Sequence, residues 1–323
     1  MTDSRTDLFA KRPAGQTGLL VTPIGMGTAP LGDMQDTFSF TVPEDRALET
    51  VRTFFRGPLN LIDTAAMYGD GTAERRIGAV LRELGGLPEG FVLETKADRD
   101  LRTGDWSADQ MRRSVERSLR LLGVDRLQIC LIHDTETSTW EQVTAKGGPL
   151  EALVRMKDEG IIEHLGIGAG PIDMIIRYVE LGVIEVVMSH NRFNLLDREA
   201  EPLMDLCQAR GIAFFNAAPY GSGMLAKGPD AFARFRYHDA EPALVERAKR
   251  MQGACESCGV TLAAAALQFS LRDPRVTSTV IGMTRPERIA QTVELAQVAI
   301  PDYLWDELNE LGASREGLPT TSP

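Results

Sequence analysis

Four residues in the first half of the chain could together transfer a proton. The stretch from 60 to 74 reads NLIDTAAMYGDGTAE, in which Asp63 ends a short apolar run and Tyr68 follows in a Gly-rich turn. Lys96 lies late in the run LETKA, and His133 lies late in the run CLIHD. A phenol, an ammonium, a carboxylate and an imidazole are all groups that enzymes use for proton transfer.

The four groups are chemically complementary. A phenol with its ordinary pKa of about 10 is a poor acid–base group at neutral pH. A nearby ammonium lowers that pKa, and a carboxylate keeps the ammonium charged. An imidazole can donate a hydrogen bond to a substrate oxygen. Such a phenol protonates a carbonyl oxygen while hydride reaches the carbon, and it acts as a base when an alcohol is oxidised. No side chain supplies hydride, so we expect a nicotinamide cofactor.

The elements that must position these groups alternate along the chain. Short apolar or β-branched runs are separated by segments of helical period, and a parallel sheet needs such helical crossovers. Eight runs in 323 residues favour a (β/α)₈ TIM barrel over an open doubly wound α/β sheet. No G-x-G-x-x-G opens the first helix, which also argues against the open sheet. The runs lie at 18–27, 59–65, 91–97, 126–134, 161–170, 183–191, 211–219 and 277–283.

A barrel would bring the candidate groups to one rim, because the active sites of such barrels lie at the carboxyl ends of the strands. Asp63, Lys96 and His133 close three consecutive runs, so we expect them in register there. A single buried Lys or Asp without a partner is costly, which favours a common site. We expect one domain over 1–323, with a flexible tail at 1–17 and a C-terminal helix and tail at 300–323.

Composition excludes several other classes of protein. Hydrophobic residues make up 43% and charged residues 25%, as in ordinary globular proteins. The net charge of −11 argues against nucleic-acid or anionic-membrane partners. No signal peptide or span-length apolar run is present, and four cysteines predict reduced thiols and a cytoplasmic protein. Cys255-x-x-Cys258 falls in a helical segment, so we predict no metal site. The oligomeric state stays open.

Three S/T-x-x-E/Q patterns predict capping boxes at helix starts, beginning at Thr41, Ser107 and Thr284. The last would place Arg285 and Arg288 in the first turn of a helix, where free N–H groups and the dipole favour an anion. Arginine donors suit a phosphate. The alternative is that both arginines are ordinary exposed charges.

These motifs resemble the aldo-keto reductase family over nearly the whole chain. DTAAMYGDGTAERRIG, LETKA and CLIHD are similar to the family's Asp–Tyr, lysine and histidine signatures. The resemblance implies a catalytic tetrad of Asp63, Tyr68, Lys96 and His133, with Tyr68 as the acid or base. SHNRFNLLDREAEPLMDLCQARGI and NAAPYGSGMLAKGP are most similar to the branch with D-threo-aldose and pyridoxal dehydrogenases. An aldose, a small aldehyde or a pyridoxal-like alcohol would then be the substrate.

The same resemblance implies a cofactor site in the second half of the chain. His190 or Asn191 would replace the usual glutamine, and backbone N–H groups of a Gly-rich turn would wrap the pyrophosphate. In NADP-using members the segment around 282–288 holds the 2′-phosphate. The expected cofactor residues are His190, Asn191, Gly221, Ser222, Gly223, Leu225, Gly282, Thr284 and Arg288.

Several positions depart from the family pattern. Gly168 and Ala169 replace a Ser-Asn pair, and Asn216 with Ala217 replaces a stacking tyrosine. Gly282 stands where many NADP-using members have lysine. We therefore expect NADP or NAD, with a slight preference for NADP.

Two aromatic residues are candidates for the substrate pocket. Trp140 follows the fourth run and would be either an apolar pocket wall or a residue that pins a long loop. Tyr220 follows the seventh run.

Two other functions remain open. One is a non-catalytic nicotinamide-binding barrel that acts as a sensor or accessory subunit, against which the complete set of four groups argues. The other is an aldolase with Lys96 as a Schiff base, in which Tyr68 and Asp63 would have no role.

Overall fold

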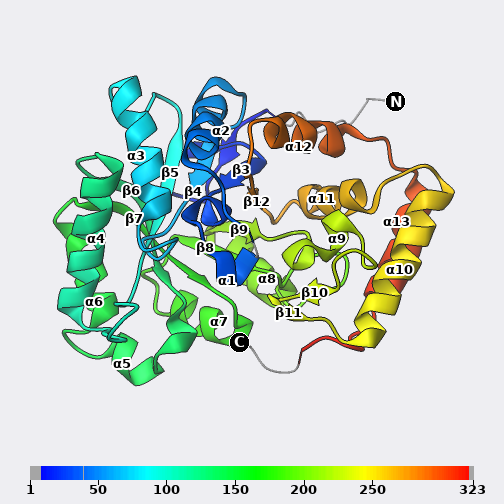
Figure 1. Cartoon of the computed structure of the whole chain (residues 1–323). Coiled ribbons are helices and arrows are strands. Elements are labelled where there is room, and N and C mark those ends of the chain that lie inside the picture. Colours follow the sequence, from blue (N-terminus) through cyan, green and yellow to red (C-terminus); the bar gives the residue numbers. More distant parts are fainter. Residues whose placement is uncertain (1–8, 39, 320–323) are drawn as a thin grey trace.

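The main feature of the structure is a closed barrel of eight parallel strands (Figure 1). The computed structural model describes residues 9–38 and 40–319. The predicted (β/α)₈ TIM barrel is confirmed, and each of the eight predicted runs contains one barrel strand. In order around the barrel the strands are β12 (Ser278–Gly282), β3 (Ile24–Gly27), β4 (Leu61–Asp63), β5 (Val92–Ala97), β6 (Leu127–His133), β7 (Ile162–Ala169), β8 (Val186–His190) and β9 (Ala213–Ala217).

The first predicted run contains two strands with different partners. Residues 20–21 form β2 (Leu20–Val21), which pairs antiparallel with β1 (Arg12–Pro13). The barrel strand β3 begins only after Pro23, which has no N–H to donate. Ala14 in this hairpin is fully buried among the side chains inside the barrel. The predicted flexible tail is therefore wrong for residues 12–17, while residues 1–8 lie outside the described residues.

Helical segments connect the strands and surround the barrel (Figure 1). The crossovers are α2 (Glu44–Arg56), α3 (Thr72–Leu84), α4 (Ala108–Leu122), α6 (Pro149–Asp158), α7 (Ile172–Glu180), α8 (Glu201–Arg210) and α11 (Leu262–Arg272). Short pieces lie in the loops: η1 (Ala29–Gly32), α1 (Gln35–Phe38), η2 (Thr135–Thr137), α5 (Trp140–Thr144), η3 (Gly221–Gly223), α9 (Met224–Lys227), β10 (Arg234–Phe235) and β11 (His238–Asp239).

Three further helices extend the fold beyond the barrel. They are α10 (Pro242–Ser257), α12 (Glu287–Gln297) and α13 (Asp302–Gly312), and α10 lies beside α13 at one edge of the molecule (Figure 1). A separate apolar cluster, which includes Leu244, Leu304 and Trp305, joins α10, α11 and α13. Within the described residues no single helix is long and apolar enough to span a membrane. The pair α10 and α11 passes that test only together, and it is bent by 97°.

Of the three predicted capping boxes, the one at Ser107 is half formed, because the Ser107 N–H donates to Asp105 and not to the Gln110 side chain. Ser107 caps α4, and its side chain accepts a hydrogen bond from the Gln110 N–H at 3.1 Å. The boxes predicted at Thr41 and Thr284 are wrong, because α2 begins after Pro43 and α12 begins after Pro286, without a side-chain cap. A proline with its fixed φ occupies each of these boundary positions and moves the helix start along the chain.

Strand alternation decides which side chains enter the barrel. Leu61, Val92 and Leu131 belong to the interior cluster, so Asp63, Lys96 and His133 also point inward, an even number of residues later. The same alternation brings Glu94 inside.

The expectation that the strand-end groups lie in register is wrong. Asp63 is paired in register with Glu94, and Lys96 with Leu131. The strands of a closed barrel are tilted and staggered, so side chains at the same height come from different register positions. Asp63 and Lys96 meet at the carboxyl end of the barrel for this reason.

Candidate active site

The Lys96 ammonium joins three of the four predicted residues. Its Nζ donates hydrogen bonds to the Asp63 carboxylate, to the Thr64 carbonyl at 2.8 Å and to the Tyr68 hydroxyl at 3.1 Å. The three protons of the ammonium therefore each have an acceptor. Lys96 is 1% exposed and Asp63 is 4% exposed. Both line one cavity together with Tyr68 and His133.

A close approach of two glycines positions the loop that carries Tyr68. Gly69 has a φ of +63°, and a Cβ built there would lie 1.6 Å from the Gly32 carbonyl oxygen. A side chain at this position would therefore push the loop away from η1. The Met67 N–H donates to Asp98 at 2.9 Å and holds the other side of the loop.

Asp98 also orients His133 and was missed in the sequence. Its Oδ1 lies 2.7 Å from Nδ1 of His133. Nε2 faces the Asp134 carboxylate, whose Oδ1 is 3.4 Å away. The His133 ring meets the Tyr68 ring edge-on, with centroids 5.9 Å apart. Asp98 follows β5 directly, so a further carboxylate at a strand end was the signal available.

The surroundings change the proton affinities of these groups. Burial raises the pKa of Tyr68 above its ordinary value, and the Lys96 charge acts against that rise. Burial alone would lower the pKa of Lys96, but Asp63, Tyr68 and Glu94 together outweigh it, with Asp63 the largest of the three, and keep the pKa raised. Burial likewise opposes the charged form of His133, yet Asp134 and Asp98 raise its pKa. The expected direction of the lysine's effect on the phenol pKa is present, but the expected net lowering of that pKa is wrong, because burial is the largest influence.

The cavity extends from these groups to the start of α12. Its volume is about 880 Å³. The predicted residues Tyr220, Ser222 and Gly223 line its wall, and the predicted residues Gly282, Thr284 and Arg288 line its far end. His190 lies at the catalytic end of the same cavity.

The predicted pyrophosphate turn is folded differently from the expectation. The Ser222 N–H donates to Asn191 Oδ1 at 3.0 Å. The Gly223 and Leu225 N–H groups both donate to the Tyr220 carbonyl, at 3.0 and 3.1 Å. Gly221 donates to the Ala218 carbonyl at 3.1 Å. These backbone N–H groups are thus bonded within the protein in this conformation, and their role toward a pyrophosphate stays a prediction. Gly221 packs against Phe235, and Leu225 lies in the apolar cluster that joins α10, α11 and α13.

The arginines at the far end are placed unequally. Arg288 is the second residue of α12, whereas Arg285 precedes the helix, which corrects the expected pair in the first turn. Arg285 donates to Gln291 at 3.1 Å. Both arginines are half-buried and line the cavity. Arg288 acts on the neighbouring Tyr220, whose pKa burial raises to about 12 against the arginine's charge.

Asn191 supports the cavity wall from behind. It is 1% exposed and accepts hydrogen bonds from the N–H and the hydroxyl of Ser222. Tyr237, in the turn between β10 and β11, was missed in the sequence, and its hydroxyl interacts with Asn191. Its ring lies 6.1 Å from that of His190. Nothing local predicts this, because Tyr237 lies far along the chain from β8.

Trp140 does not line the cavity. It begins α5 and packs against Tyr178, with ring centroids 4.8 Å apart. The Arg177 guanidinium covers its ring at 3.9 Å. Of the two predicted interpretations, Trp140 pins the loop, and the pocket-wall prediction is wrong.

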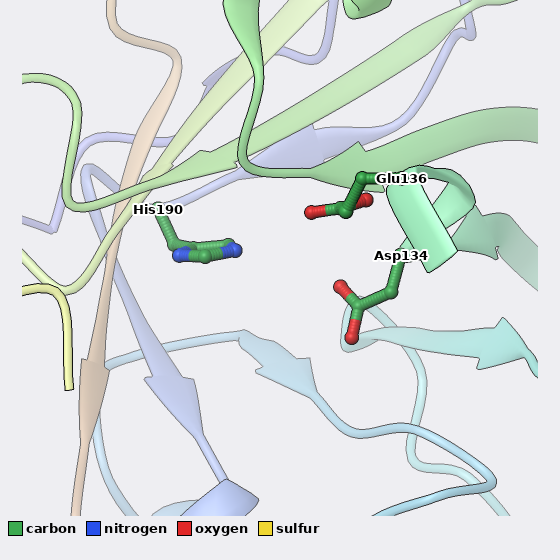
Figure 2. A group of neighbouring side chains, drawn as sticks. All are labelled: Asp134, Glu136 and His190. Atoms are coloured by element: carbon green, nitrogen blue, oxygen red, sulfur yellow. The ribbon is translucent and has the colours of Figure 1, made fainter. Parts of the chain in front are cut away.

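Three more side chains meet beside His133, from β8 and from the segment after β6. Figure 2 shows Glu136 and His190 facing one another, with Asp134 beside them. One potential ligand atom from each lies within 4.8 Å of the others. Burial lowers the pKa of His190 to about 4, so its ring is neutral at neutral pH. Two carboxyl groups and a neutral imidazole accept hydrogen bonds or bind cations. No metal site was predicted from the sequence, and neither Asp134 nor Glu136 belongs to a motif that would have indicated one.

The family follows from comparison with known proteins. The sequence profile of the aldo/keto reductase family matches residues 23–313. The chain belongs to this family, and it is an NAD(P)-dependent oxidoreductase with a (β/α)₈ barrel.

Three characterised relatives match nearly their whole length. Pyridoxal 4-dehydrogenase of Microbacterium luteolum is 32% identical, over 94% of this chain and 97% of the relative. L-galactose dehydrogenase of Arabidopsis thaliana is 30% identical, over 95% and 91%. D-threo-aldose 1-dehydrogenase of a Pseudomonas species is 29% identical, over 92% and 96%. The branch predicted from the sequence contains the first and third of these.

A solved structure has the same fold. The holo form of an aldo-keto reductase from Bacillus halodurans superposes with a TM-score of 0.76. It is 22% identical and covers 95% of this chain and 98% of its own.

A buried carboxyl group lies inside the barrel near the Lys96 ammonium. Glu94 is fully buried, and neither of its carboxyl oxygens has a hydrogen-bond partner among the described residues. Burial, and then the charge of Asp63, raises the pKa of Glu94 well above its ordinary value. The folded protein therefore holds the Glu94 proton more tightly than the unfolded chain does.

Glu94→Gln should stabilise the protein increasingly as the pH rises. The stability that the Glu94 proton contributes is fully present below the unfolded pKa of about 4.3. As the pH rises from there to the raised folded pKa, this stability is lost by up to about 1.4 kcal/mol per pH unit. The Gln variant does not titrate and loses none of it. Thermal unfolding at pH 5 and pH 8 measures this, with exposed Glu89→Gln as the control. A difference between variant and wild type that is the same at both pH values would contradict the assignment.

Proposed function

We propose that the protein transfers hydride between a nicotinamide cofactor and the carbonyl or alcohol carbon of a small substrate, with Tyr68 as general acid or base. One observation carries the proposal: the Lys96 ammonium bonds simultaneously to Asp63, to the Thr64 carbonyl and to the Tyr68 hydroxyl at the wall of the cavity. A phenol in this position can exchange its proton with a substrate oxygen in the cavity, while the lysine stabilises the phenolate.

Each group has a distinct role in the proposed reaction. In reduction, the Tyr68 hydroxyl gives its proton to the substrate oxygen, and Lys96 stabilises the phenolate that remains. Nδ1–H of His133 donates to Asp98, so Nε2 can donate a hydrogen bond to the same oxygen only from the protonated ring, the form that Asp134 and Asp98 favour by raising the pKa of His133. Asp63 compensates the buried ammonium. In oxidation the proton moves back from the alcohol to Tyr68.

The nicotinamide cofactor supplies or accepts the hydride. The residues proposed to hold it line the cavity: His190 at the catalytic end, Ser222 and Gly223 on the wall, and Gly282, Thr284 and Arg288 at the far end. The fit rests on the cavity's shape and charge, since one continuous cavity joins the tetrad to the half-buried arginines.

Substrates of the proposed reaction are an aldose, a small aldehyde or a pyridoxal-like alcohol. The named activities of the relatives support this range, which includes a pyridoxal and two sugar dehydrogenases. A cytoplasmic location, expected from the reduced cysteines, is part of the same proposal.

The aldolase alternative is disfavoured by the state of Lys96. Schiff-base formation needs a neutral amine, whereas Asp63 keeps the pKa of Lys96 raised and all three ammonium protons are bonded. The sensor alternative predicts cofactor binding without turnover.

Tyr68→Phe should lower kcat by roughly 10²–10⁴-fold, because it removes the transferred proton but keeps the ring. Cofactor binding, followed by quenching of protein fluorescence, should change little. Turnover is followed by the absorbance of the reduced nicotinamide with sugars, aldehydes and aromatic alcohols. Tyr303→Phe on the exposed face of α13 is the matched control. Near-wild-type turnover of Tyr68→Phe would exclude the mechanism, and cofactor binding without any wild-type turnover would favour the sensor.

For the choice of nucleotide we propose binding of both, with a slight preference for NADP(H). Arg288 is half-buried and lines the cavity, and within the described part of the chain it has no ion-pair partner. A guanidinium in that state suits a phosphate. Gly282, in place of lysine, removes one cation from the same end and keeps the preference small.

Arg288→Ala should weaken NADP(H) binding by about 1.5–3 kcal/mol, the scale of a hydrogen bond to a charged group. NAD(H) binding should weaken clearly less. Titration of both nucleotides against wild type and variant measures this, with exposed Arg250→Ala on α10 as the control. Equal losses would show that Arg288 contacts only the adenosine common to both, and the preference would then move to NAD.

A further inference from the structure

Asp134 occupies a position that the proposed chemistry leaves without a role. It directly follows His133 and has φ 43° and ψ 48°, the left-handed conformation. Asp tolerates this conformation better than most residues, although it remains strained. The Asp134 N–H donates to the Gly168 carbonyl at 2.9 Å, which fixes the residue against β7. Its carboxylate lines the cavity, with Oδ1 3.4 Å from Nε2 of His133.

Glu136 adds a second acceptor beside Asp134. One oxygen accepts a hydrogen bond from the Gly170 N–H at 3.0 Å, which anchors the side chain. The other oxygen is buried and has no hydrogen-bond partner among the described residues. Figure 2 shows the Glu136 carboxyl group directed toward His190. Burial, and then the charge of Asp134, raises the pKa of Glu136, so Glu136 supports Asp134 from behind.

The cavity has opposite charges at its two ends. Arg285, Arg288 and Lys227 line the part near α9 and α12, while Asp134 and Glu136 line the part near His133. Lys96 at the same end is paired with Asp63, so substrate groups near His133 meet the Asp134 carboxylate. A carboxylate or phosphate on the substrate is repelled there, whereas a hydroxyl can donate a charge-assisted hydrogen bond.

We propose that Asp134, supported by Glu136, selects substrates with a hydroxyl group on the carbon next to the reacting carbon. The inference rests on the proposed function, in which the reacting oxygen lies between Tyr68 and Nε2 of His133. An acceptor 3.4 Å from that nitrogen is then beside the neighbouring carbon. The substrate class is a 2-hydroxyaldehyde or its cyclic aldose form, uncharged at that position.

The test compares matched substrates that differ only in this hydroxyl. Glycolaldehyde is paired with acetaldehyde, and an aldose that the wild type turns over is paired with its 2-deoxy analogue. Asp134→Asn keeps the size of the side chain and tolerates the left-handed conformation, but it removes the charge. Glu141→Gln in neighbouring α5 is the exposed control. The readout is kcat/KM for each pair, for all variants.

The wild type should prefer the hydroxylated member of each pair by about tenfold or more, as for a hydrogen bond to a charged group. Asp134→Asn should lose most of that preference because kcat/KM falls for the hydroxylated substrate. For the deoxy substrate, kcat/KM should change by less than about threefold. Glu136→Gln should reduce the same ratio by a smaller factor. If Asp134→Asn does not fold, Asp134→Gly, which is free at this φ, replaces it.

Three results would overturn the inference. Equal loss on both members of a pair would mean that Asp134 acts only through His133. Loss of the preference after dialysis of the wild type against EDTA would mean that a cation held by Asp134, Glu136 and His190 makes the selection. Wild-type turnover without any preference for the hydroxyl would exclude the subsite. Absence of wild-type turnover on every substrate with both nucleotides is a different result, because it rejects the proposed function itself.

Discussion

A buried ammonium, that of Lys96, is the interaction on which the site depends. Placing one charge inside a barrel is unfavourable unless a counter-charge and further acceptors compensate it. Here Asp63 supplies the charge, and the Thr64 carbonyl and the Tyr68 hydroxyl supply the other acceptors. Removing one member of such a buried pair typically costs about 3–5 kcal/mol. The ends of β4 and β5 and the loop after β4 are therefore held together by the same contacts that prepare Tyr68 for proton transfer.

Charged groups of opposite sign also line the two ends of the cavity. Asp98 and Asp134 flank His133 and favour its charged form, while the arginines near α12 lie at the opposite end. A nucleotide with phosphates and an uncharged polyol would thus be sorted to different ends of one cavity. This arrangement agrees with membership of the aldo/keto reductase family and with the similarity to pyridoxal and sugar dehydrogenases. Fold alone does not specify the substrate, so the carboxylates carry the argument for a hydroxylated one.

The sequence predicted what depends on local pattern and strand order. Eight apolar runs gave the barrel, and the strand-end positions of Asp63, Lys96 and His133 brought them to one cavity. The sequence-based predictions failed where contacts between distant segments determine the position of a residue. Asn191 and Tyr220 accept hydrogen bonds from the N–H groups of Ser222, Gly223 and Leu225, and α7 covers Trp140. Local sequence reveals neither arrangement. Tyr237 and Glu136 acquire their positions only through tertiary packing, and prolines overrode two capping patterns.

The most direct test of the account is the pH dependence of alcohol oxidation by Lys96→Met. Oxidation needs the phenolate of Tyr68, and the account states that the ammonium lowers the phenol pKa relative to the protein without it. The rate of the variant should fall at neutral pH and recover partly at alkaline pH, with the rise displaced upward by roughly one to three pH units relative to wild type. Exposed Lys146→Met, in the loop after α5, should keep the wild-type profile. A Lys96→Met profile with an unchanged midpoint would show that Lys96 does not set the proton affinity of Tyr68, and would contradict the account.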